Sequence, residues 1–188
     1  LQKLESDVNA KIDALPASKS DAPGLAHDRF EWRIRKGLRE DAKDLMLARS
    51  TSAVALGQAP RWANRRRALA RDEMRNGDAQ RAYRLASQHF LTDGSNYADL
   101  EWLSGYIALR FLDDPTTALG HFQNHDNAVE SPISQGRAGY WQGRALEAMG
   151  DAESAAKAYA MGAEYQTSFY GLLAAERGGL PFDEKLAG

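Results

Sequence analysis

Three short joints of one kind divide the middle of the chain at nearly equal intervals. They read MRNGDAQRAY, FLDDPTTALG and AMGDAESAAKAY, and each has an aspartate where one helical pattern gives way to the next. These aspartates are Asp78, Asp114 and Asp151, spaced 36 and 37 residues apart. An aspartate before a helix accepts hydrogen bonds from the free amides of the first turn, so each is predicted to be an N-cap. Evenly spaced helix starts predict a repeat of helix pairs.

Other residues recur with these joints. Four residues after each aspartate stands an alanine, a small side chain that lets the second helix of a pair lie close to the first: Ala82, Ala118 and Ala155. Tryptophans recur 40 and 39 residues apart on the first helices, in a different phase from the aspartates: Trp62, Trp102 and Trp141. A period of about 37 to 40 residues with paired helices is typical of tetratricopeptide-like and HEAT-like arrays.

We therefore predict an all-α fold, a right-handed α-superhelix in which a solenoid of helix pairs forms an arc. Residues 1–188 are expected to form one domain, with a less regular part over 1–58 and helix-pair repeats over 60–180. The segments Pro16–Pro23 and Ser50–Pro60 are expected to be loops. Helical period predicts helices near 1–14, 28–37, 40–49, 60–76, 78–91, 96–112, 115–128, 132–149, 151–163 and 167–178. Thr167 is the expected N-cap of the last of these.

The helix over 99–112, DLEWLSGYIALRFL, is apolar on two sides. Such a helix is sandwiched between neighbours, so we expect Trp102 to be a core residue.

Composition narrows the function classes. Hydrophobic residues make up 43% of the chain and charged residues 27%, which favours a folded protein over a disordered one. The formal net charge of −2 gives no overall attraction to nucleic acid. The chain has no cysteine, which excludes disulfides and thiolate metal sites. No apolar run approaches the roughly 18 residues that a transmembrane helix needs.

The order of the motifs carries a resemblance to a known family. EWLSGYIALRFLDDPTTALGHF is followed by SPISQGRAGYWQGRALEAMGDAESAAKAYAMGAEYQTSFYGLLAAERGGLP. Over about residues 60–181 this order resembles the superhelical region of soluble lytic murein transglycosylases. The matching elements are a Glu-Trp-Leu helix, an Asp-Pro joint, a Pro-Ile-Ser entry, a Tyr-Trp-x-Gly-Arg-Ala helix, a Gly-Asp joint and a Thr-x-Phe-Tyr-Gly helix.

The resemblance implies a periplasmic protein of Gram-negative bacteria that takes part in cell wall turnover. In that family a lysozyme-like domain cleaves the bond between N-acetylmuramic acid (MurNAc) and N-acetylglucosamine (GlcNAc) to give a 1,6-anhydro product. We expect residues 181–188 to be a linker toward such a domain. The family's catalytic Glu-Ser-x-Phe motif is not present, since Glu5, Glu130 and Glu153 precede a serine without the phenylalanine. No catalytic residue is therefore assigned, and the chain is expected to be an inactive scaffold that holds peptidoglycan glycan strands.

Two groups of residues are candidates for substrate contact. The helix RWANRRRALARDE contributes Arg65 and Arg66, whose guanidinium groups suit the carboxylates of stem peptides. Tyr140, Trp141 and Arg144 could line a glycan groove. The alternatives are a solvated helix face for the arginines and solenoid core for the aromatic residues.

Phe169 and Tyr170 are candidates for a domain interface, because in the family their helix packs near the catalytic domain. His121 and His125 stand four residues apart, a spacing that can bind zinc, but no third ligand is evident. We therefore predict no metal and no cofactor.

Two other functions remain open. One is a tetratricopeptide-like adaptor that binds a protein or peptide, and the other is an arginine-dependent binder of acidic polymers. In each case we expect a monomer.

Overall fold

The structure, a computed structural model, describes residues 7–183, apart from the side chains of residues 13, 17 and 18. All regular elements within these limits are α-helices, which confirms the all-α class. They are α1 (Val8–Asp13), α2 (Ala17–Ser20), α3 (Pro23–Arg35), α4 (Arg39–Arg49), α5 (Ala53–Leu56), α6 (Ala59–Asn76), α7 (Ala79–Ser87), α8 (Gly94–Phe111), α9 (Pro115–Asn127), α10 (Pro132–Ala148), α11 (Ala152–Ala163) and α12 (Phe169–Gly178).

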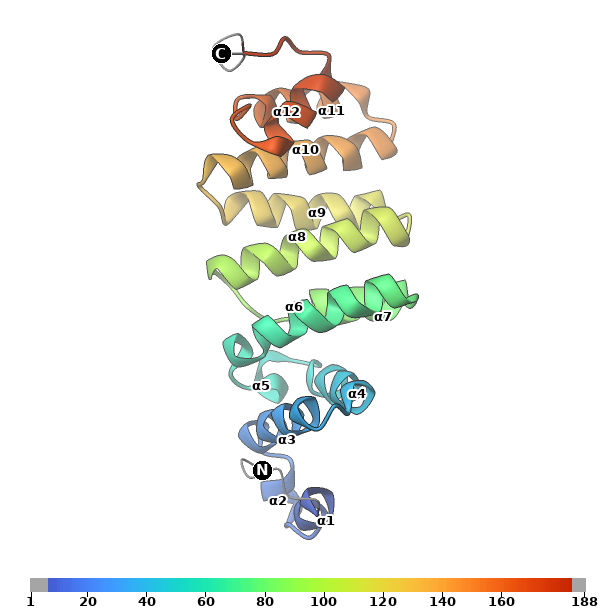
Figure 1. Ribbon diagram of the computed structural model, residues 1–188, viewed down its shortest axis with the longest axis vertical. Helices are drawn as coiled ribbons and strands as arrows, with labels where there is room; N and C mark the ends of the chain where they lie inside the picture. The colour runs from blue at the N-terminus through green and yellow to red at the C-terminus, as the bar shows by residue number, and fades with distance from the viewer. Residues whose placement is uncertain (1–6, 184–188) are drawn as a thin grey trace.

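The helices follow one another along the long axis of the molecule in chain order, from α1 at one end to α12 at the other (Figure 1). The most extensive contacts join the successive pairs α6–α7, α8–α9 and α10–α11. The first helices also contact one another, α6 with α8, α8 with α10 and α10 with α12. Each element is therefore held by its neighbours in the sequence.

The three joints have the predicted aspartate caps. The carboxylate of Asp78 accepts a hydrogen bond from the backbone N–H of Arg81 at 2.8 Å. Asp114 and Asp151 accept equivalent bonds from Thr117 and Ser154, each at 3.0 Å. The alanines that follow them are buried, as their small size predicted: Ala82, Ala118 and Ala155.

Helices α10 and α11 pack so closely that no side chain would fit between them at Gly139. A Cβ atom added to Gly139 of α10 would lie 2.5 Å from the backbone nitrogen of Gly162 on α11. Real Cβ atoms do not approach backbone so closely, so only glycine fits here. Gly139, the second glycine of SQGRAGYWQ, is thus a packing residue, and it fixes the position of α10 beside α11.

Two large apolar clusters form most of the core. One joins Phe30 of α3 and Met46 of α4 to Trp62 of α6 and continues to α8. The other runs from Phe122 of α9 through α10 and α11 to α12. Tyr83 and Trp102 pack against both clusters, so the core is continuous through α7 and α8.

Several boundaries differ from the prediction. Helix α3 begins at Pro23 rather than near residue 28, because a proline in the first turn has the backbone angle that a helix needs. Short helices α2 and α5 lie within the two expected loops. The cap of α12 is Ser168, whose hydroxyl accepts from the N–H of Gly171 at 3.1 Å, so the prediction of Thr167 was wrong by one residue.

Helix α7 ends at Ser87 instead of reaching residue 91. Phe90 has a φ of 54°, which no helix continues through. The ring of His89 accepts a hydrogen bond from the backbone N–H of Leu91 at 3.0 Å and holds this turn. The expected helix over 1–14 is described only from Val8, since residues 1–6 lie outside the described part.

Candidate functional site

Alternate helices bring a set of arginine and aromatic side chains together on one connected surface. Helix α6 supplies two arginines one turn apart, α8 an acid and two aromatic residues, α10 a third arginine, and α12 a tyrosine. We call this surface the arginine–aromatic face, and its members are Arg67, Arg71, Asp99, Trp102, Tyr106, Arg137 and Tyr170. All seven side chains are partly accessible to solvent.

The aromatic part of the face is built on α8. Trp102 and Tyr106, one helical turn apart, are stacked with ring centres 5.3 Å apart. The ring of Trp141 supports both, 5.1 Å from Tyr106 at an angle of 82°. Tyr170 adds a further ring, 6.2 Å from Trp141. The guanidinium carbon of Arg137 lies 5.0 Å from the centre of the Trp102 ring, a cation–π distance.

The charged part of the face has one acid among three bases. The carboxylate of Asp99 forms an ion pair with Arg67 through one oxygen. Its other oxygen lies 3.7 Å from Arg137. Loss of hydration lowers the pKa of Arg71, and the positive charge of Arg67 lowers it further. Loss of hydration also lowers the pKa of Arg137. The surface is thus locally positive in a chain whose formal net charge is −2.

Arg65, one of the predicted contact residues, faces a different neighbour. Its Nε atom lies 3.4 Å from a carboxylate oxygen of Glu31 on α3. About half of the Arg65 side chain is exposed, so its guanidinium group remains accessible beside Glu31.

The prediction that Arg66 contacts a ligand at the surface was wrong, because its side chain is fully buried. One terminal nitrogen donates to the carbonyl oxygen of Leu85 at 2.8 Å, and the other donates to the hydroxyl of Ser50 at 2.5 Å. These groups lie at the C-terminal ends of α7 and α4, whose helix dipoles favour a positive charge. Burial lowers the pKa of Arg66 to about 9. Arg66 therefore joins two helix ends and is a structural residue.

Tyr140 and Trp141 are core residues, only 8% and 7% exposed. The alternative that these aromatic residues belong to the core therefore holds for both, and they cannot line an open groove with their ring faces. Arg144 lies over the Tyr140 ring at 5.9 Å and donates to its hydroxyl at 3.1 Å. It also lies 3.5 Å from Glu147. Trp141 takes part in the arginine–aromatic face only as a support for the rings of Trp102, Tyr106 and Tyr170.

The predicted interface residues on α12 behave differently from each other. Phe169 is 68% exposed, one of the most exposed large apolar side chains in the described chain. Tyr170 is half-buried and packs on Tyr140, with ring centres 5.5 Å apart. The side chain of Phe169 is thus available to a partner, while Tyr170 links α12 to α10.

His121 and His125 do not share a metal site. His125 is fully buried and hydrogen-bonds the carbonyl oxygen of Ala98 at 2.8 Å. His121 lies between Glu101 at 2.7 Å and the hydroxyl of Tyr83 at 2.9 Å. Among residues 7–183 no cluster of three or more acidic, histidine or cysteine groups is arranged to hold a metal ion.

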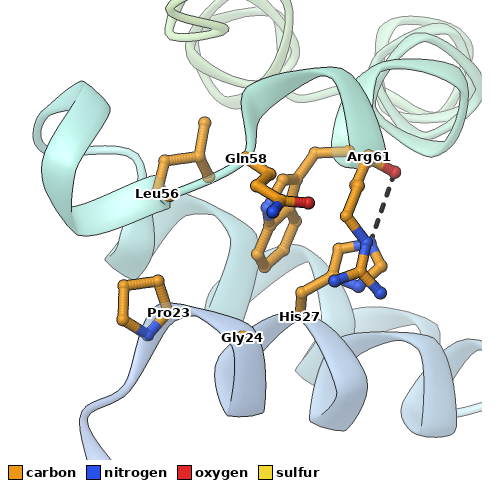
Figure 2. Close-up of a pocket in the computed structure, with 8 residues that line it drawn as sticks. Pro23, Gly24, His27, Leu56, Gln58 and Arg61 are labelled. Atoms are coloured by element: carbon orange, nitrogen blue, oxygen red, sulfur yellow. Dashed lines mark hydrogen bonds between the residues drawn. The ribbon is translucent and has the colours of Figure 1, made fainter.

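A cavity of about 240 Å³ lies between the first turn of α3 and the start of α6 (Figure 2). Pro23, Gly24 and His27 line one side, and Arg61 lies opposite. Two of the polar groups here already have partners within the protein, although the Nδ1 atom of His27 is buried without a hydrogen-bond partner. Nε2 of His27 donates to the carbonyl oxygen of Arg61 at 3.3 Å, and the Arg61 guanidinium lies 3.5 Å from Asp28. The arginine–aromatic face, whose charges are only partly matched, is the stronger candidate.

Residues that sequence reasoning missed include Tyr106, Asp99 and Arg137. A signal for the last two was present, because they precede the recurring tryptophans Trp102 and Trp141 by about one helical turn. Opposite charges at similar positions of neighbouring first helices favour a contact between them. The tryptophans and the capping aspartates repeat in different phases, and this difference obscured the matching positions of Asp99 and Arg137.

Comparisons with protein-family models, with curated proteins and with solved structures find no match for this chain. Within residues 7–183, no helix combines the length and the apolar character needed to cross a bilayer.

Proposed function

We propose that this chain is the non-catalytic superhelical scaffold of a periplasmic lytic murein transglycosylase. Its helix pairs form a right-handed arc that holds peptidoglycan glycan strands. A lysozyme-like domain beside the arc cleaves their MurNAc–GlcNAc bonds to 1,6-anhydro products. The arc itself contributes binding and orientation and supplies no catalytic group.

The observation that carries the proposal is the arginine–aromatic face. The apolar C–H faces of sugar rings pack on aromatic rings, and Trp102 and Tyr106 offer two stacked rings on one helix. Guanidinium groups pair with carboxylates, which peptidoglycan stem peptides carry. The face combines both chemistries across several helices, and an elongated ligand needs such a succession of contacts.

The order of motifs supports the same function. The caps at Asp114 and Asp151, and the glycine contact at Gly139, give structural reasons for the Asp-Pro joint, the Gly-Asp joint and the glycines near Tyr-Trp. These residues serve the helix-pair architecture, so they support the scaffold part of the proposal more directly than the choice of ligand.

A second candidate is a tetratricopeptide-like adaptor for a protein partner. Exposed apolar side chains favour it: Ile133 is 69% exposed, Phe169 68% and Phe111 46%. Clusters of exposed apolar residues mark protein interfaces when they are contiguous. These three lie on three different helices.

The test is binding of the chain to purified murein sacculi by pull-down at low and moderate salt, with a parallel assay for release of anhydro-muropeptides. Tyr106→Leu keeps apolar volume but removes the stacking ring, and should weaken binding about three- to tenfold. Val54→Ser, at a position 85% exposed on α5, is the matched control and should bind as the unmodified chain does.

Binding that survives moderate salt, depends on Tyr106 and releases no muropeptides supports the glycan-holding scaffold. A chain that does not bind sacculi at either salt concentration contradicts it and favours the adaptor. Binding that disappears at moderate salt and ignores Tyr106 indicates a charge-driven binder of acidic polymers.

A further inference from the structure

The arginine–aromatic face has more positive charge than its own acid can match. Asp99 offers two carboxylate oxygens, and Arg67 and Arg137 lie against one each. Arg71, one turn after Arg67 on α6, has no ion-pair or hydrogen-bond partner among the described residues. Three guanidinium groups thus share a single carboxylate.

The surroundings of Arg71 make its unpaired positive charge energetically unfavourable. The side chain is half-buried, so it has lost part of its hydration without gaining a partner. The positively charged neighbours Arg67 and Arg75 oppose its charge, and only Asp99 favours it. A bound anion would replace the missing hydration and relieve the repulsion between the arginines.

Arg137 has unused hydrogen-bonding capacity on the same surface. Its contact with Asp99 is 3.7 Å, longer than a hydrogen bond. Its Nε–H has no partner in the described chain either, but it is enclosed by the protein, so the terminal nitrogens are the donors that face a ligand. The stack on Trp102 holds the plane of the guanidinium group, so its donors are oriented before any ligand arrives.

We propose that Arg71 and Arg137 form an anion subsite that binds a carboxylate of the ligand, next to an apolar contact on Trp102 and Tyr106. The subsite rests on the proposed function for its ligand class, and it deepens that function by assigning charge recognition to α6 and α10. The stem-peptide carboxylate is bound by the two arginines while the adjoining sugar ring packs against Tyr106, beside the Trp102 ring that Arg137 covers. The recognised unit is therefore an acidic muropeptide rather than a neutral sugar chain.

The distribution of charge favours a carboxylate on a glycan over the repeated phosphates of a nucleic acid. A nucleic acid needs a continuous basic stripe, whereas this chain has formal net charge −2 and the arginine–aromatic face includes an acid, Asp99. A single carboxylate with two oxygens matches two neighbouring forks.

The experiment measures binding of soluble peptidoglycan fragments by calorimetry. One sample keeps its stem-peptide carboxylates and the other has them converted to neutral amides, so the two ligands differ in charge at the same size. The unmodified chain should bind the acidic form about tenfold more tightly. Arg71→Gln should reduce this preference to about twofold or less, since the uncharged amide cannot replace the guanidinium.

Arg84→Gln is the matched control, because Arg84 is an exposed arginine on α7 that lies beside residues of α4. It should keep the full preference for the acidic form. Arg71→Lys should recover only part of the preference, because an ammonium group lacks the planar fork. Thermal melting of each variant establishes that all are folded.

The outcomes separate the subsite from the function on which it rests. If the unmodified chain binds acidic and amidated fragments equally, the subsite is overturned while glycan binding stands. If Arg71→Gln and Arg84→Gln lose the preference to the same extent, general charge is responsible and the subsite is again overturned. If neither fragment binds, both the subsite and the proposed function fail.

Discussion

Asp113 occupies a backbone conformation that the equivalent joints give to glycine. The residue before the capping aspartate has a positive φ in all three joints, 120° at Gly77, 53° at Asp113 and 81° at Gly150. A side chain in this region is strained, although aspartate tolerates it better than most residues. The second joint therefore forms with a local cost that the other two avoid.

Replacing Asp113 with glycine should increase the free energy of unfolding by about 0.5–1 kcal/mol, because the strain is removed. Chemical denaturation at neutral pH measures it. The reciprocal change, Gly150→Asp, should lower the free energy of unfolding by a similar amount. An unchanged or reduced stability of the glycine variant would show that the Asp113 side chain has another stabilising role.

At the scale of elements, a network of polar side chains connects α8 to α9 and to the segment between α7 and α8. Glu101 of α8 accepts hydrogen bonds from His121 at 2.7 Å, His89 at 3.0 Å and Asn124 at 3.1 Å. Burial alone would raise the pKa of Glu101, but the hydrogen bonds from His121 and His89 outweigh it and lower the pKa to about 2. The ionised carboxylate is thus the form that holds these elements together.

This shift predicts how stability changes with pH. A carboxyl group whose pKa is lower in the folded state stabilises the fold above its unfolded pKa, and this contribution disappears as the pH falls. The difference in the free energy of unfolding between the unmodified chain and Glu101→Gln should reach its largest value near pH 6, at roughly 2–3 kcal/mol. It should decline as the pH falls from about 4.5 toward 2.

Urea unfolding of the two proteins across this pH range gives the difference directly. Glu130→Gln, at an exposed position, should show no such pH-dependent difference from the unmodified chain. A difference between the chain and Glu101→Gln that stays constant from pH 6 to pH 3 would contradict an ionised Glu101 in the folded state.

The helices and their caps were more predictable from the sequence than the arginine–aromatic face. The caps at Asp78, Asp114 and Asp151 were predictable because capping depends on residues within one turn. The end of α7 was not, because the positive φ of Phe90 is maintained by a turn around His89.

The candidate site was predictable only in its residue types. Arg66 and Arg67 are adjacent in sequence, yet one is enclosed by two helix ends and the other pairs with Asp99. Which of them reaches solvent depends on the rotation of α6 against α8, which a degenerate repeat does not specify. The same rotation decides that Trp62 is buried whereas Trp102 is only partly so. The expectation that Trp102 is a core residue was therefore only partly correct, because it packs against the core without being fully buried.

At the scale of the whole molecule, two core clusters meet at α7 and α8. Phe122 is fully buried in the second cluster. Phe122→Ala should lower the free energy of unfolding by about 3–5 kcal/mol through the cavity it leaves. In an array held by neighbour contacts, the loss is confined mainly to the elements nearest the change.

Amide hydrogen exchange measures where that loss falls. Exchange should accelerate by the largest factor in α8 to α11 and least in α3 and α4, which belong to the first cluster. Uniform acceleration from α3 to α12 would show instead that the chain unfolds as a single cooperative unit.

The stacking of helices in chain order also governs how the protein is made (Figure 1). Since each helix packs mainly on helices next to it in sequence, forming a native contact closes only a short loop. The buried residues of the first cluster all lie within or before α8, so it can assemble while the later helices are still being synthesised. The ribosome thus delivers the helices in the order in which they pack, and the growing end of the folded part is the surface on which the next helix docks.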